Sequence, residues 1–196
     1  MSITVGLTGP SGAGKSMASA VAAEKGFFVI DCDKTARKAV EPGTPGLSAL
    51  VSAFGKGILD AGGFLNRKEL ASAAFSSAEK TELLNKTLLP HIAALIEPEL
   101  CREYVLLDAP TLYESGLDKK CDVTVAVLAD VSERTERIIR RDGLTLNEAR
   151  LRISAGKPDS FYLERADKIL YNNGDFKSFL SDAEELFEII MGGHIK

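Results

Sequence analysis

The sequence of 196 residues has no excess of basic side chains: 24 Lys and Arg are outnumbered by 28 Asp and Glu, which gives a formal net charge of -4 at pH 7. A general nucleic-acid binder needs such an excess to neutralise phosphates, so we expect no nucleic-acid partner. A small phosphate ligand is compatible with this charge, because backbone N–H groups and a few cations can bind one locally.

Cysteine and long apolar runs are also scarce. Cys32, Cys101 and Cys121 are widely spaced and form no Cys-x-x-Cys or Cys/His cluster, so we expect neither a disulfide framework nor a zinc site. No apolar run reaches the length of about 20 residues that crosses a bilayer, and Met1–Leu7 has no signal-peptide pattern. We therefore expect a cytoplasmic protein with no membrane partner. We also expect either a monomer or a weak homo-oligomer.

What the sequence does have is an alternation of short apolar runs and amphipathic stretches. We predict helices at Lys15–Lys25, ended by Gly26, and at Phe176–Met191, and a helix that Ser132 caps and Gly143 ends. The apolar runs predict five buried strands at Ile3–Leu7, Phe27–Ile30, Tyr104–Asp108, Val123–Leu128 and Lys168–Tyr171. This alternation predicts an α/β fold with a mostly parallel sheet and helices on both faces.

The alternation breaks between Gly43 and Glu103, which looks helical throughout, with Gly57–Leu59 as its one candidate strand. We expect a single domain whose core spans about residues 1–42, 104–133 and 166–196. A helical insertion at about 43–103 would bind the acceptor substrate, and a helical lid would span about 134–165.

One local motif stands out directly after the first predicted strand. Gly9-Pro10-Ser11-Gly12-Ala13-Gly14-Lys15-Ser16 matches Gly-x-x-x-x-Gly-Lys-Ser/Thr and opens a helix. Glycines let successive N–H groups turn toward an anion, Lys15 adds a charge for the β- and γ-phosphates, and the Ser16 hydroxyl can bind Mg²⁺. The motif predicts a P-loop that binds MgATP. A guanine-specific Asn-Lys-x-Asp motif is missing, because Asn85-Lys86 continues Thr87-Leu88 inside a helical pattern.

Carboxylates follow two of the predicted strands, where ligands bind in open α/β sheets. In an extended strand end, Asp31 and Asp33 would share one side, and either could accept a hydroxyl proton or orient Mg²⁺. The alternative is that one of them only caps a helix beginning near Lys34. Asp108 would order the metal ion, or it is a solvated turn residue before Pro110.

A helix after the fourth strand is rich in arginine, with Arg134, Arg137 and Arg141 on one face and Arg140 beside them. Guanidinium groups stabilise the charge of a migrating phosphoryl group, so this helix could belong to a lid. We favour that role for Arg141. For the other arginines we favour a solvent-exposed helix with pairs such as Glu133–Arg137.

Together these features resemble the dephospho-CoA kinase family over nearly the whole chain. Each motif alone is weak, but their order and spacing are specific. The similar segments are Gly6-Leu7-Thr8-Gly9 through Ser16, Asp31-Cys32-Asp33 with Ala36-Arg37, Pro42–Pro45, Pro110–Leu117, Arg141-Asp142-Gly143, and Ala166-Asp167 with Asn172-Asn173-Gly174.

The resemblance implies transfer of the ATP γ-phosphate to the ribose 3′-hydroxyl of dephospho-CoA. It implies that Asp33 is the general base and that Lys15 and Arg141 are catalytic, with Mg²⁺ held by Ser16, Asp31 and Asp108. The implied nucleotide contacts are Gly9, Ser11, Gly12, Ala13, Gly14, Lys15, Ser16, Met17 and Asn173. The implied substrate contacts are Thr8, Asp33, Arg37, His91, Leu112 and Glu114.

Three positions depart from the family pattern, where His, Gln and Asp are replaced by Leu89, Gly156 and Tyr171. Either His91 replaces the histidine missing at Leu89, or its contact is absent. Two other functions share the P-loop: a kinase for another small hydroxylated acceptor, and an ATP-binding switch without useful turnover.

Overall fold

The structure, a computed structural model, describes residues 2–193 and divides the chain into two compact units. The sheet unit comprises the chain up to Ile30, Arg102–Leu112 and the chain from Leu117 onward. The helical unit comprises Asp31–Cys101 and Tyr113–Gly116. Each unit has a hydrophobic core of its own.

A five-stranded sheet forms the centre of the sheet unit. Its strands are β1 (Ile3–Thr8), β2 (Phe28–Asp31), β3 (Tyr104–Asp108), β4 (Val123–Leu128) and β5 (Lys168–Tyr171), in the order β2-β3-β1-β4-β5. β1 is parallel to both of its neighbours, β3 and β4, and β4 is parallel to β5. Every residue of β1 and β4 is buried, as expected for parallel strands covered on both faces.

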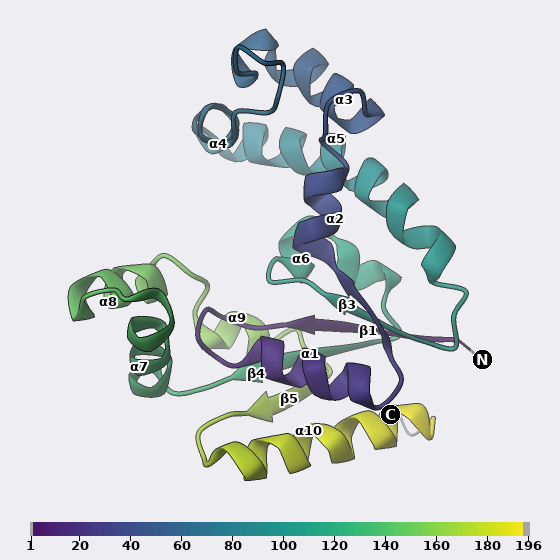
Figure 1. Ribbon diagram of the computed structural model, residues 1–196, viewed down its shortest axis with the longest axis vertical. Coiled ribbons are helices and arrows are strands. Elements are labelled where there is room, and N and C mark those ends of the chain that lie inside the picture. The colour runs from purple at the N-terminus through teal and green to yellow at the C-terminus, as the bar shows by residue number, and fades with distance from the viewer. Residues whose placement is uncertain (1, 194–196) are drawn as a thin grey trace. The chain divides into compact units, whose positions relative to one another are not determined.

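Helices cover both faces of this sheet. The helical elements of this unit are α1 (Lys15–Glu24), η3 (Leu117–Lys120), α7 (Val131–Asp142), α8 (Leu146–Ser154), α9 (Asp159–Leu163) and α10 (Phe176–Met191), of which α8 packs on α7. α1 and α10 pack side by side (Figure 1), and Val5 of β1 shares a core with Phe187 of α10. Gly6 points to the other face, where it lies against Leu112 and Cys121. The predicted three-layer α/β architecture is therefore confirmed.

The helical unit is built around the long helix α5. Its elements are α2 (Cys32–Lys38), α3 (Pro45–Phe54), η1 (Lys56–Ile58), α4 (Arg67–Ala74), α5 (Ala78–Ile96), η2 (Glu97–Glu99) and most of α6 (Leu112–Ser115). α5 packs against α2, α3 and α4. The core of this unit consists of Val40, Leu50, Ile58, Leu70 and Ala74.

Polar side chains fix where these helices begin. Thr44, Asn66 and Ser77 each accept a hydrogen bond from a backbone N–H in the first turn of α3, α4 and α5, which satisfies a donor that has no partner within the helix. The stretch between Gly43 and Glu103 is helical, as predicted. The strand predicted there at Gly57–Leu59 is wrong, because Lys56–Ile58 forms a 3₁₀ turn and Leu59 makes an isolated bridge to Leu65.

Two further boundaries differ from the prediction. The second strand is Phe28–Asp31, because the buried Phe27 belongs to the core beneath α1 and α10 and precedes the strand. Ser132 does not cap α7, which begins at Val131 with Asp130 in the cap position. Within residues 2–193, no helix combines the length and apolar character needed to span a bilayer.

Candidate functional site

The P-loop connects β1 to α1 through backbone conformations that favour glycine. Gly9, Gly12 and Gly14 have φ angles of 148°, 82° and 106°, in the region that side chains with a Cβ rarely adopt. Space is also restricted, because a Cβ on Gly9 would lie 2.3 Å from the carbonyl oxygen of Val127. A larger residue at these positions would have to move the loop.

This loop delivers a helix N-terminus to the end of the central strand. Gly14 occupies the N-cap position of α1 and has no side chain to cap it, so the first N–H groups of α1 remain available to an anion. Ser11 and Ser16 are exposed. The side chain of Met17 instead packs on the sheet core, and its N–H donates to the Gly14 carbonyl at 2.9 Å.

Lys15, the first residue of α1, and Asp108, the last residue of β3, form an ion pair. Both side chains are largely withdrawn from solvent, with exposed fractions of 16% and 15%. The structure therefore brings together two residues that the sequence assigned to phosphate and metal binding. Within residues 2–193 there is no group of three or more His, Cys, Asp or Glu that could hold a metal without other ligands.

Thr8 and Leu112, predicted to contact the substrate, lie in the framework of the sheet unit. Both are fully buried, and the Thr8 hydroxyl donates to the Pro110 carbonyl at 3.2 Å. Leu112 lies against Gly6. Their burial gives no support to a direct substrate contact, because a side chain without exposed surface cannot touch a ligand in this conformation.

The end of β5 carries two asparagines with different surroundings. Asn173 is exposed, and its side chain pairs with Asp130 at the start of α7: Oδ1 accepts from the Asp130 N–H at 2.8 Å, and Nδ2 donates to Oδ1 of Asp130 at 3.0 Å. Asn172 is buried, and its Nδ2 donates to the carbonyl of Ala13 in the P-loop at 2.8 Å.

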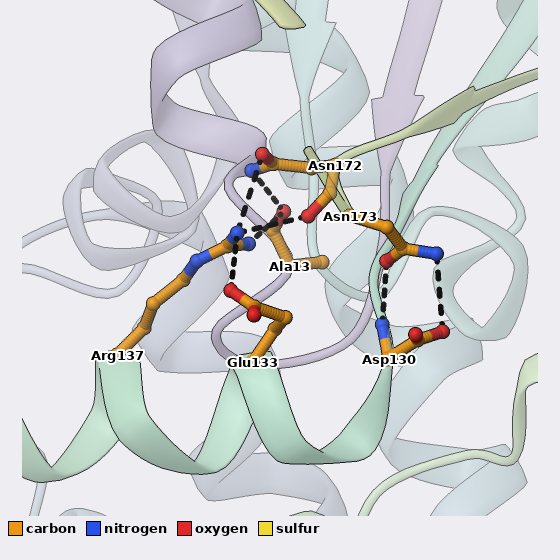
Figure 2. Close-up of polar contacts among 6 residues, drawn as sticks. All are labelled: Ala13, Asp130, Glu133, Arg137, Asn172 and Asn173. Atoms are coloured by element: carbon orange, nitrogen blue, oxygen red, sulfur yellow. Dashed lines mark hydrogen bonds and ion pairs between the residues drawn. The ribbon is translucent and has the colours of Figure 1, made fainter. Parts of the chain in front are cut away.

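Arg137 of α7 joins the same cluster (Figure 2). Its guanidinium donates to the carbonyl of Asn172 at 2.8 Å and to that of Ala13 at 3.4 Å, and it pairs with Glu133 at 3.2 Å. Asn172 and Arg137 were named from the sequence only as parts of longer patterns and were not among the predicted site residues. The sequence did contain a signal for Asn172: it is a polar residue directly after an apolar strand, where a buried side-chain amide needs hydrogen-bond partners.

Of the three α7 arginines that we expected to be exposed, two are not. Arg134 is only 4% exposed and pairs with Asp159 at 3.3 Å. Its backbone lies against Gly12 of the P-loop, so α7 turns this face inward and Arg134 is buried with it. The prediction of exposure is therefore wrong for Arg134 and for the partly buried Arg137, and it holds for Arg140.

Arg141, the residue of this helix predicted to be catalytic, is exposed and held by its neighbour. Its Nε and Nη2 donate to the two carboxylate oxygens of Asp142 at 2.7 and 2.8 Å, and Arg152 also pairs with Asp142. The paired hydrogen bonds raise the pKa of Arg141 and lower the pKa of Asp142. Arg141 therefore carries its charge at every physiological pH.

In the helical unit, Asp31 and Asp33 do not continue an extended strand. The strand ends at Asp31, which caps α2 by accepting from the Lys34 N–H at 2.9 Å. The capping bond draws the chain into a helix at Cys32, so the expected alternation of Asp31 and Asp33 on one side of a strand is wrong. The cap role that we considered for one of these acids belongs to Asp31.

Asp33 and Arg37 lie on α2 and are both exposed. The Asp33 side chain forms no hydrogen bond or ion pair with any residue among 2–193. Its carboxylate is therefore unoccupied by protein donors, as a general base requires.

The structure addresses whether His91 replaces the histidine that Leu89 displaces. Both residues lie on α5, where two positions along the chain are about 200° apart around the axis. The Leu89 side chain is near Gly116, and the His91 Cβ is near Gly46. Leu89 and His91 therefore lie on different sides of α5. Glu114 lies two residues before Gly116, and its carbonyl accepts from the Asn85 side chain at 3.1 Å.

Comparison with known proteins places this chain in a family. A model of the dephospho-CoA kinase family matches residues 3–178. A dephospho-CoA kinase of Corynebacterium glutamicum is 39% identical, with 96% of this chain and 98% of that protein aligned.

Solved structures agree with the fold. The protein TT1252 of Thermus thermophilus has a TM-score of 0.78 and 30% identity, covering 98% of this chain and 97% of its own. A dephospho-CoA kinase of Campylobacter jejuni has a TM-score of 0.68, covering 99% of this chain and 100% of its own, and at 24% identity this likeness concerns the fold. On the family match and the identity with its relatives, the chain belongs to the dephospho-CoA kinase family.

Proposed function

We propose that this kinase transfers the γ-phosphate of ATP to the ribose 3′-hydroxyl of dephospho-CoA, producing coenzyme A and ADP. Membership of the family carries the proposal, and ATP is the phosphate donor of such kinases. The observation in the structure that supports it best is the P-loop with Lys15 paired to Asp108 at the adjacent strand end, since phosphoryl transfer depends on positioning and on charge stabilisation.

The sheet unit would bind ATP. The N–H groups of the loop from Gly9 to Gly14 would surround the phosphates, and the Lys15 ammonium would exchange its pairing with Asp108 for the β- and γ-phosphates. Asn173, beside the start of α7, would lie near the adenine. Arg141 would release Asp142 and stabilise the charge on the migrating phosphoryl group.

A magnesium ion would accompany the nucleotide. The Ser16 hydroxyl and the Asp108 carboxylate are oxygen ligands of the kind that Mg²⁺ prefers, and they lie at the first turn of α1 and the end of β3. Bound there, the ion would neutralise phosphate charge. Asp31 fits this role less well, because its carboxylate already accepts from the Lys34 N–H and pairs with the Lys34 ammonium at 3.1 Å.

The helical unit would contribute the acceptor side. Asp33 would take the proton of the 3′-hydroxyl as that oxygen bonds to the γ-phosphorus and ADP leaves. Arg37, His91 and Glu114 would contact dephospho-CoA. We propose residues of about 43–103 as the acceptor-binding insertion and about 134–165 as a lid, whose closure would exclude water.

The test is ADP release from MgATP with dephospho-CoA, nucleosides or nucleoside monophosphates as acceptors, for the wild type and Asp33→Asn. We expect turnover only with dephospho-CoA, and a loss of about 10²–10⁴-fold in kcat for the variant, as for removal of a general base. Turnover only with another acceptor would refute the substrate assignment. ATP binding without turnover would indicate a nucleotide-dependent switch instead.

A further inference from the structure

The P-loop has an outer side as well as a phosphate-binding side. When backbone N–H groups of such a loop turn inward, carbonyl groups turn outward, and a buried carbonyl needs a donor. Ala13 is fully buried. Its carbonyl accepts from Nδ2 of Asn172 at 2.8 Å and from Nη1 of Arg137 at 3.4 Å. Two side chains distant in sequence therefore hold the back of this loop.

Asn172 is itself fixed by its surroundings. Its backbone N–H donates to the Leu128 carbonyl at the end of β4 at 2.8 Å, while its Oδ1 accepts from Arg137 at 3.4 Å. One end of the side chain donates to Ala13 and the other accepts, so an amide is the group that satisfies both contacts. At 2% exposure, Asn172 has almost no water to replace a lost partner.

Gly14 shows how closely this amide and the loop fit. A Cβ on Gly14 would lie 2.1 Å from Nδ2 of Asn172, so the amide packs directly on the loop backbone. The loop conformation at Gly14, with φ at 106°, and the position of Asn172 are thus specified together.

Arg137 extends this arrangement to α7 (Figure 2). Glu133, one turn earlier on α7, pairs with the Arg137 guanidinium at 3.2 Å and orients it. We propose that Asn172 and Arg137 are positioning residues, which hold the P-loop in its phosphate-binding conformation and connect that loop to α7. This proposal rests on the proposed ATP binding and assigns the two residues no contact with substrate.

The test measures dissociation constants for ATP and for inorganic tripolyphosphate, which has the phosphates but no base. We expect Asn172→Ala and Arg137→Met each to weaken tripolyphosphate binding about tenfold, since each removes a hydrogen bond from a buried carbonyl. The double variant leaves the buried Ala13 carbonyl without either side-chain donor, so it should bind tripolyphosphate more weakly than each single variant. Arg140→Met, on the same helix but exposed, is the matched control and should bind like the wild type.

A purely structural role would give a different result. It would lower the melting temperature of Asn172→Ala but leave the tripolyphosphate affinity of the folded protein within about twofold of the wild type, and that result would overturn the proposal. Arg137→Lys keeps the charge but offers one ammonium in place of a planar fork, so its tripolyphosphate affinity should lie between those of Arg137→Met and the wild type. This variant provides the test if Asn172→Ala folds poorly. Tripolyphosphate binding is independent of the acceptor, so a failure of the proposed function leaves this test unaffected.

A separate observation in the helical unit carries a second inference. A groove of about 470 Å³ has two arginines, Arg37 and Arg67, among its lining residues. Neither side chain pairs with any residue among 2–193. The apolar part of the lining includes Val40, Leu65 and Phe64, which is 55% exposed, and Glu41 is the acid.

This combination matches one part of the proposed acceptor. Guanidinium groups bind phosphate oxygens through paired hydrogen bonds, and an apolar wall suits an uncharged chain. We infer that the groove receives the diphosphate and pantetheine part of dephospho-CoA. The inference rests on the proposed function and specifies which part of the substrate this surface binds.

The test is calorimetric binding of 4′-phosphopantetheine, which lacks the nucleoside, alongside the KM for dephospho-CoA. We expect Arg37→Met and Arg67→Met each to weaken the binding of 4′-phosphopantetheine by about tenfold and to raise the KM for dephospho-CoA by about tenfold. The KM for ATP should be unchanged. Lys68→Met, which removes an exposed cation next to Arg67, is the control. Unchanged binding of 4′-phosphopantetheine in both arginine variants would overturn the inference. Turnover of dephospho-CoA by the same variants at a normal KM would show that the proposed function stands without this groove.

Discussion

Gly14 and Gly26 show two different reasons why a position requires glycine. Both have positive φ angles, 106° and 103°. A Cβ on Gly14 would lie 2.1 Å from Nδ2 of Asn172, whereas a Cβ on Gly26 would meet nothing within 4 Å. Gly26 is required by backbone conformation alone, and Gly14 by conformation together with packing.

We therefore predict unequal costs for two identical substitutions. Gly26→Ala should lower the free energy of unfolding by about 1 kcal/mol, the cost of a positive φ for a residue with a Cβ. Gly14→Ala should cost more and should also abolish tight ATP binding, because Asn172 has to move. Urea denaturation and ATP titration of both variants check this. Equal losses of stability, with ATP binding retained, would contradict the packing argument.

Lys15 and Asp108 show what an ion pair at a strand end can do for a kinase. In the structure each compensates the charge of the other in a largely buried setting, where an unpaired charge is unfavourable. Phosphates that took over Lys15 would leave Asp108 free to bind a cation. The pair thus suits a site that receives phosphate and Mg²⁺ together.

We predict that Asp108→Asn changes the dependence on magnesium. The variant should retain nucleotide binding through the P-loop but need a higher Mg²⁺ concentration for half-maximal turnover, by about tenfold, because a neutral amide is a weaker ligand than a carboxylate. Initial rates over a range of Mg²⁺ concentrations at fixed ATP measure it. An unchanged magnesium dependence would remove Asp108 from the metal site.

Among the elements, α10 shows how a cap depends on charge. Asp175 accepts hydrogen bonds from the N–H groups of Lys177 and Ser178 at 2.8 and 3.2 Å, and from the Ser178 hydroxyl at 2.7 Å. The hydrogen bond from the Ser178 hydroxyl, followed by those from the backbone N–H groups, lowers the pKa of Asp175 below its ordinary value of 3.8. The start of α10 is therefore stabilised by an ionised carboxylate.

The sign of the pH dependence follows from that lowered pKa. The cap contributes fully above the unfolded-state pKa of 3.8, and its contribution is lost as pH falls below that value through the folded-state pKa. We predict that Asp175→Asn, which keeps an oxygen acceptor, loses less stability than the wild type between pH 5 and about pH 3. Thermal melts across this range compare the two proteins. Parallel loss of stability would show that the carboxylate does not titrate as a cap.

At this scale the sequence predicted types better than boundaries. α10 was predicted residue for residue, because its apolar face has helical spacing and Gly192 follows it. The predicted start of α7 was wrong because Asp130 is held by Asn173, which is 43 residues away. No local pattern contains that contact. The helical turn at Cys32 was missed because a strand end and a helix cap place the same residue type, Asp31, at the same position.

The site could be predicted in the same uneven way. The P-loop was identified because it is local, a run of eight residues with fixed spacing. Asn172 and Arg137 were not predicted as site residues, because the role that we propose for them depends on hydrogen bonds to Ala13, more than 120 residues away. The burial of Arg134 also came from packing against the loop, which the charge pattern of its own helix does not reveal.

For the whole molecule, the important feature is that each unit has a separate core. The sheet unit packs Phe179 and Phe187 against the sheet, and the helical unit packs around Leu50. All three side chains are almost fully buried. A cavity in one core should therefore act first on the ligand that its own unit binds.

We predict that Leu50→Ala separates the two halves of the reaction. It should destabilise the helical unit by about 2–5 kcal/mol and raise the KM for dephospho-CoA, while the dissociation constant for ATP stays within about twofold of the wild type. Phe187→Ala, in the core of the sheet unit, should instead weaken ATP binding. Calorimetry with ATP and initial rates with dephospho-CoA measure both. Equal effects of the two variants on ATP binding would show that the cores are not independent.

The most direct test of the proposed reaction is formation of coenzyme A from MgATP and either dephospho-CoA or its 3′-deoxy analogue, followed by chromatography of the products. The proposed reaction predicts one coenzyme A for each ADP released from dephospho-CoA, and no phosphorylated product from the analogue, which lacks the accepting oxygen. A phosphorylated product from the 3′-deoxy analogue would contradict phosphorylation at the 3′-hydroxyl. Release of ADP without coenzyme A from dephospho-CoA would contradict the proposed kinase activity itself.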